Sequence, residues 1–135
     1  MNIIDEYRFN KARCEILKLD IKTYENDYVN LGDTKERLDT LERLNSAYKA
    51  TLDFISAFES AYDLLTDDEK YYIVEHYYNE KPQKDIALYY LSNPEKILNI
   101  SPYKTLSDKT LNLITIIRYL TNFNKSIMKK LERIK

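Results

Sequence analysis

Glycine and proline are scarce in this sequence, and this scarcity restricts the fold more than any other feature. The 135 residues include one glycine, Gly32, and three prolines. Tight turns between β-strands usually need more positions with positive φ than a single glycine supplies. Leucine, isoleucine, lysine and acidic residues instead recur at intervals of three and four, which is typical of amphipathic helices. The sequence therefore predicts an all-α protein.

The first segment, residues 1–65, carries two long apolar stripes at helical spacing. One stripe predicts a helix over about Ile3–Leu31, and the other predicts a helix over about Lys35–Leu65. The glycine between them ends the first helix, and Asp33 or Thr34 caps the second. A connection this short favours a long antiparallel hairpin. We expect this hairpin to serve self-association or the binding of a partner.

The second segment, residues 66–135, carries signals for a compact bundle of shorter helices. Thr66 and Glu69 match a capping box, which predicts a helix that runs to about Tyr78. A break at Asn79–Pro82 separates it from a helix that begins at Gln83 and ends near Leu91. Three residues of this helix are expected to face the core: Ile86, Ala87 and Tyr90.

Two prolines mark the remaining helix starts, because proline is favoured at the first position of a helix. Pro94 predicts a short helix through Leu98. Ser101 is expected to cap a final helix whose first residue is Pro102. That helix reaches Leu120, and an extension to Ile134 is left open.

The charge is distributed unevenly along the chain. Residues 1–65 hold nine Lys/Arg and thirteen Asp/Glu, and residues 66–100 hold four and seven. Residues 101–135 hold eight Lys/Arg against two Asp/Glu, a net charge of +6. This asymmetry suggests contact with a polyanion at the carboxyl-terminal end. The alternative is an ordinary solvated helix that happens to be basic.

No pattern for catalysis, a metal or a cofactor is present in the sequence. Cys14 is the one cysteine, which excludes an internal disulfide and fits a reducing cytosol. His76 is the one histidine, and the thirteen tyrosines are expected to serve mostly as core residues. No apolar run reaches the roughly 18 residues of a membrane span, and the charged amino terminus has no signal-peptide core. We expect a non-enzymatic protein of the bacterial host cytoplasm.

Three short motifs follow one another in the order of a helix-turn-helix: Leu65–Glu69, Asp85–Ala87 and Leu98–Ser101. Over residues 64–120 they resemble the DNA-binding core of sigma factor region 4 and of LuxR-type regulators, and still more that of phage late-gene activators of the ArpU/RinA kind. The connection between Ala87 and Leu98 is longer than in those families. An inserted turn, or a second register in which Ser107 and Thr110 open the recognition helix, is therefore left open.

The resemblance implies a DNA-binding transcriptional regulator of phage or mobile-element origin. The helix after Ser101 would read the major groove, with Lys104 or Lys109 on guanine and Asn112 on adenine. Gln83 and Lys84 would contact phosphates at the start of the preceding helix. The remaining candidate DNA-binding residues are Tyr103 and Thr105, with Lys125, Lys129, Lys130 and Arg133 adding salt-dependent affinity.

Double-stranded DNA is the implied partner, and RNA polymerase or another regulatory protein is left open as a second one. A homodimer formed through the amino-terminal hairpin is expected. The rival interpretation is a helical protein-interaction module that binds and modulates a host or phage protein. A third interpretation keeps the helix-turn-helix core as a scaffold that has lost its DNA contacts.

Overall fold

A computed structural model describes residues 1–31, 34–103 and 111–135, except for the side chains of residues 27–31. Every regular element in these ranges is helical, which confirms the all-α prediction. The chain divides into two compact units, Met1–Ser60 and Ala61–Arg133. Among the described residues, no helix combines the length and the apolar character needed to cross a bilayer.

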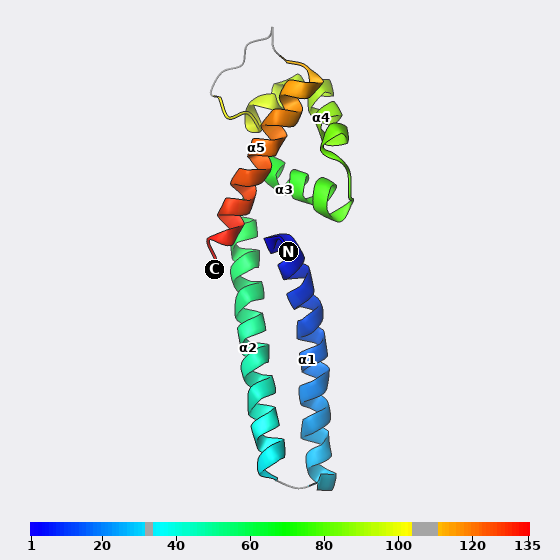
Figure 1. Cartoon of the computed structure of the whole chain (residues 1–135), viewed down its shortest axis with the longest axis vertical. Coiled ribbons are helices and arrows are strands. Elements are labelled where there is room, and N and C mark those ends of the chain that lie inside the picture. The colour runs from blue at the N-terminus through cyan, green and yellow to red at the C-terminus, as the bar shows by residue number, and fades with distance from the viewer. Residues whose placement is uncertain (32–33, 104–110) are drawn as a thin grey trace. The chain divides into compact units, whose positions relative to one another are not determined.

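The first unit is a hairpin of two long antiparallel helices, α1 (Ile3–Leu31) and α2 (Lys35–Asp63), of which only the last three residues fall in the second unit (Figure 1). Thr34 caps α2, because its hydroxyl accepts a hydrogen bond from the Arg37 amide at 3.2 Å. The Arg37 side chain is buried and donates to the Tyr24 carbonyl oxygen at 2.7 Å. This bond ties α2 to α1 close to the connection between the two helices. Asp33, the other predicted cap, lies outside the described residues.

At the opposite end of the hairpin, aromatic and polar contacts join the two helices. The rings of Tyr7 and Phe58 stack with centroids 4.1 Å apart. The Tyr7 hydroxyl donates to Glu59 at 2.9 Å, and Lys11 lies 3.8 Å from the same carboxylate. Cys14 is buried on α1, so it behaves as a small apolar residue of the seam between the helices.

The second unit begins with the predicted capping box. The Thr66 hydroxyl accepts from the Glu69 amide at 3.2 Å, and the Glu69 carboxylate accepts from the Thr66 amide at 2.9 Å. This pair starts α3 (Asp67–Ile73), which continues directly into a π-helical segment, η1 (Val74–Tyr78). The predicted helix to about Tyr78 is therefore confirmed, although its last turn is wider than an α-helix.

Residues 79–82 reverse the chain between η1 and the next helix. Glu80 adopts φ 58°, a left-handed conformation that is uncommon for a residue other than glycine. Lys81 holds the turn in place, because its ammonium lies 2.6 Å from the Glu75 carboxylate. The His76 ring nitrogen Nδ1 lies 2.8 Å from the Lys81 carbonyl oxygen and donates to it. The single histidine thus supports a turn.

Helix α4 (Gln83–Ser92) and the 3-10 helix η2 (Pro94–Asn99) follow, as predicted. Pro94 stands at the start of η2, where its missing amide hydrogen costs nothing. The three residues expected to face the core are at most 1% exposed: Ile86, Ala87 and Tyr90.

The final helix differs from its prediction. Ser101–Tyr103 are not helical, so the expected start at Pro102 is wrong. The Ser101 hydroxyl accepts from the Tyr103 amide at 3.0 Å, a local bond that makes a turn where the helix was expected. The described final helix is α5 (Leu113–Glu132), capped by Asn112, whose side-chain oxygen accepts from the Thr115 amide at 2.9 Å.

Helix α5 packs against α4 and α3 and supplies one wall of the core of the second unit (Figure 1). Its buried residues recur at intervals of three, four and seven: Ile116, Tyr119, Leu120, Ile127 and Leu131. The helices that α5 packs against contribute further buried residues to the core of this unit, Tyr72 and Ile73 from α3 and Ile86 and Tyr90 from α4. One side of α5 is therefore apolar and covered, and the other side faces solvent.

Candidate nucleic-acid interface

The solvent side of α5 carries a row of basic residues. Arg118, Lys125, Lys129 and Arg133 follow one another at steps of seven, four and four residues, and all four are exposed. These steps place the four side chains on one side of a helix. Asn122 and Ser126 lie between them on the same side and are also exposed. We call these six residues the basic face.

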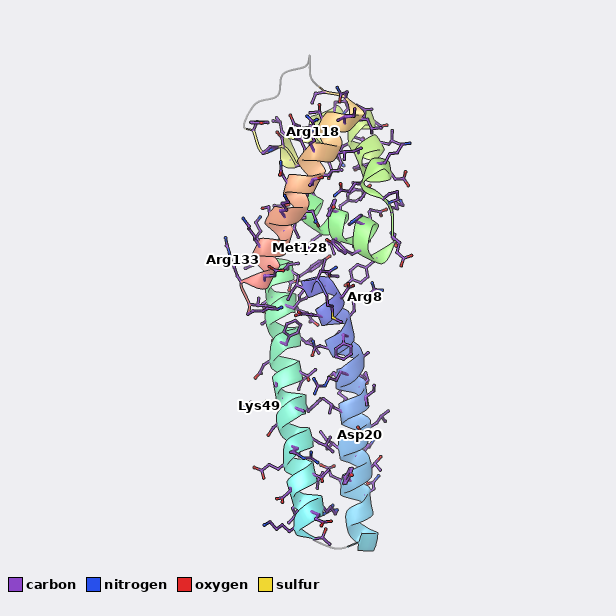
Figure 2. All side chains as sticks on the ribbon, in the orientation of Figure 1. Arg8, Asp20, Lys49, Arg118, Met128 and Arg133 are labelled. Carbon is purple, nitrogen blue, oxygen red and sulfur yellow. The ribbon has the colours of Figure 1, made fainter. Side chains whose placement is uncertain are left out.

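The basic face is long and continuous. At a rise of about 1.5 Å per residue, the distance along the helix from Arg118 to Arg133 is about 22 Å. Figure 2 shows Arg118 in the first half of α5 and Arg133 at its carboxyl end. The row therefore runs over most of the length of the helix.

Two shallow hollows follow the basic face, and most of the residues that line them are polar or aromatic. The first hollow is lined by Asn122, Lys125, Ser126, Lys129, Lys130 and Arg133. The second is lined by Pro102, Tyr103, Thr115, Arg118, Tyr119 and Asn122. They meet at Asn122, and no carboxylate lines either of them. Tyr103 is 64% exposed, and its ring packs edge-on against Tyr119.

The charge of this part of the chain is strongly positive. Between Leu113 and Lys135 there are six basic residues and one acidic residue, Glu132. Within the described ranges, none of the four cations of the basic face forms an ion pair with a carboxylate. An anion that approaches this surface meets cations that no described acid has neutralised.

Lys130, the lysine next to Lys129, has a different role. Its ammonium lies 2.7 Å from the carboxylate of Glu69, which is 2% exposed. Burial raises the pKa of Glu69, but the hydrogen bonds from Lys130 and from the Thr66 amide outweigh burial and hold the pKa below its usual value. Lys130 therefore ties α5 to the start of α3 as part of the bundle.

Gln83 also bonds within the bundle. Its side-chain nitrogen donates to the Tyr72 hydroxyl at 3.0 Å, and its side-chain oxygen accepts from Thr121 at 3.2 Å. Burial raises the pKa of Tyr72 to about 12, although the bond from Gln83 works in the opposite direction. The Gln83 amide thus joins α4 to α3 and α5, whereas the neighbouring Lys84 is exposed.

The residues proposed to read bases do not form a described site. Lys104, Thr105 and Lys109 lie outside the described residues, as do Ser107 and Thr110 of the second register. Asn112 is described, and its side-chain oxygen is occupied as the cap of α5.

The basic face therefore overlaps only partly with the predicted site. Lys125, Lys129 and Arg133 lie on it, and Tyr103 lies beside it. Arg118, Asn122 and Ser126 are on the basic face but were not among the predicted site residues. The interval pattern from Arg118 to Arg133 is the signal that could have found them.

Within the described part of the chain, no group of three or more His, Cys, Asp or Glu side chains is placed to hold a metal ion. Comparisons with protein-family models, with curated proteins and with solved structures find no match to this chain.

Proposed function

We propose that this protein binds double-stranded DNA through the basic face of α5 and acts as a transcriptional regulator of phage or mobile-element origin. The observation that carries the proposal is the row of four exposed cations, none of which is paired with a described carboxylate. Duplex DNA presents one negative charge per roughly 1.7 Å of helix axis. A row of cations about 22 Å long therefore meets several phosphates at once.

The residue types suit phosphate contacts. The guanidinium groups of Arg118 and Arg133 can each donate two hydrogen bonds to one phosphate, and the two lysines between them add point charges. Asn122 and Ser126 add neutral donors along the same line. Contacts of this kind fix the affinity and the position of a protein on DNA, but they do not read sequence.

Base reading and transcriptional regulation are proposed only because the chain resembles helix-turn-helix regulators. Lys104, Thr105 and Lys109 follow the Leu98–Ser101 motif, and they remain the predicted contacts to base edges. A contact with RNA polymerase or another regulatory protein has the same basis. Self-association through the hairpin is the last part of the proposal, because two copies would bring two basic faces to one duplex and strengthen binding.

Fluorescence anisotropy with a labelled duplex, measured at several salt concentrations, tests the DNA role. Neutralising four phosphates per copy predicts a slope of about −3.6 in a plot of log affinity against log salt. The double variant Lys125→Ala/Lys129→Ala should reduce the size of this slope by about 1.8. Lys49→Ala is the matched control, because Lys49 is an exposed lysine of α2 and is not part of the basic face (Figure 2).

Two results contradict the DNA role. One is the absence of binding at low salt, and the other is a salt slope that the double variant leaves unchanged. A protein partner captured from nuclease-treated host lysate, together with no affinity for DNA, would support the protein-interaction module instead.

A further inference from the structure

Helix α1 has a second apolar seam on the side that faces away from the hairpin. Phe9, Ala12, Ile16, Leu19 and Thr23 recur at alternating steps of three and four, the spacing of a coiled-coil seam. All five are exposed, and Phe9, Ile16 and Leu19 are 56%, 58% and 65% exposed. We call these five residues the outer seam.

The outer seam lies opposite the seam that the hairpin already uses. Cys14 and Leu17 of α1 are buried, and Tyr7 stacks on Phe58 of α2. Successive residues of a helix turn by about 100°, so Ile16 points away from Cys14 by about 200°. Contact with α2 therefore leaves the outer seam uncovered, and a helix with apolar residues on two sides needs a further partner.

We infer that the outer seam is a self-association surface, on which α1 of a second copy packs in the antiparallel direction. This inference rests on the self-association proposed above and is independent of the DNA role. The charges that flank the outer seam favour α1 of a second copy as the partner, and they determine its direction. One flank carries Glu6, Arg13 and Asp20, and the other carries Arg8, Glu15 and Lys22.

A parallel pair of α1 helices would bring like charges together. In parallel coiled coils, each residue of one flank lies beside the residue five positions later on the other flank of the second helix. Arg8 would then face Arg13 of the second copy. Glu15 would face Asp20 of the second copy, which repeats the repulsion with negative charges. The parallel arrangement is therefore disfavoured.

An antiparallel pair brings opposite charges together in one register. When Ile16 packs against Leu19 of the second copy, Arg13 lies beside Asp20 of the second copy and Glu15 lies beside Lys22 of the second copy. The two-fold symmetry makes each pair twice. In the single copy, Arg13 and Asp20 form no ion pair within the described residues, and Glu15 has only an exposed partner, Lys18, at 3.4 Å.

Sedimentation equilibrium without DNA tests the surface. The unmodified protein should form a dimer at micromolar concentration, and Ile16→Lys should weaken association at least about tenfold, because it places a charge in the apolar seam. Leu38→Lys is the matched control, since Leu38 is an exposed leucine of the same hairpin, outside the outer seam. Equal helix content by circular dichroism shows that each variant is folded.

A charge exchange tests the direction. Arg13→Asp and Asp20→Arg should each weaken the dimer by several-fold, because each variant places like charges side by side twice. The double variant Arg13→Asp/Asp20→Arg restores opposite charges and should recover the affinity of the unmodified protein. Both sites are exposed, so none of these changes disturbs the hairpin itself.

Each contrary result removes a defined part of the inference. A monomeric protein at micromolar concentration removes self-association and the outer seam together, while leaving the DNA role to its own titration. A dimer that survives Ile16→Lys keeps the proposed self-association but overturns the outer seam as its surface. A double variant no tighter than the single variants overturns the antiparallel register.

Discussion

The two units of this protein bury their apolar residues to different degrees. Of the large side chains that are fully buried, only Ile3 and Ile4 belong to the hairpin. The others belong to the second unit: Tyr72, Tyr90, Ile73, Ile86, Ile97, Ile116, Leu120, Ile127 and Leu131. The hairpin instead leaves Phe9, Ile16 and Leu19 more than half exposed on α1. A bundle of several helices can surround its core, whereas two helices cover only one side of each other. The second unit therefore encloses its own core, whereas the hairpin leaves large apolar side chains of α1 exposed.

The largest expected effect compares one residue type in the two units. Ile116 is 0% exposed in the bundle, and Ile16 is 58% exposed on α1. Ile116→Ala should lower the free energy of unfolding by about 3 kcal/mol, because it leaves a cavity in a packed core. Ile16→Ala should change it by less than about 0.5 kcal/mol in the monomer. Urea unfolding at low protein concentration measures both values. Equal losses of unfolding free energy for the two variants would contradict the difference in burial between the two units.

A smaller effect separates two neighbouring lysines of α5. Lys130→Met removes the partner of the buried Glu69 carboxylate and should lower the free energy of unfolding by about 1–2 kcal/mol. This is less than for a fully buried pair, because the Lys130 side chain is 45% exposed. Lys129→Met should leave stability within about 0.5 kcal/mol of the unmodified protein and weaken only DNA binding. A larger loss of stability for Lys129→Met than for Lys130→Met would mean that Lys129, and not Lys130, is the structural lysine.

The same carboxylate predicts a dependence on pH. The pKa of Glu69 is lower in the folded protein than its usual value, so the folded state favours the charged form. Its contribution to stability is fully present above the unfolded pKa of about 4.3, and it is lost as the pH falls through the folded pKa. Glu69→Gln should flatten this part of a plot of unfolding free energy against pH, and an unchanged plot would argue against the lowered pKa.

The smallest effect concerns the cap of α5. Asn112→Ala should lower the free energy of unfolding by about 1 kcal/mol, because the Thr115 amide loses its acceptor. Asn122→Ala is the control on the solvent side of the same helix and should cost less than about 0.5 kcal/mol. Equal thermal midpoints for the two variants would show that Asn112 does not act as a cap.

Local signals in the sequence predicted most of the fold. The capping box of Thr66 and Glu69, the proline at the start of η2 and the buried face of α4 all depend on residues close together in the chain. The start at Pro102 was wrong because the Ser101–Pro102 signal is compatible with both a helix cap and a local turn, and the Ser101–Tyr103 bond makes the turn. Short polar signals of this kind do not determine whether a helix continues.

The candidate site was less predictable than the fold. The sequence gives no indication that Gln83 bonds to Tyr72 and Thr121, or that Lys130 reaches Glu69, because these partners lie 11 to 61 residues away in the chain. The spacing of the basic face was readable in the sequence. The spacing alone does not show that these residues are exposed together. That follows only from the packing of the opposite side of α5 into the core.

Amide chemical-shift mapping on addition of a short DNA duplex tests the central claim most directly, since it reports on both units at once. We predict that the largest shifts fall on the basic face, at Arg118, Asn122, Ser126 and Arg133, and that they disappear at high salt. Shifts in α1 and α2 should remain small. Shifts concentrated on the hairpin, or none at any salt concentration, would contradict the assignment of α5 as the surface that binds DNA.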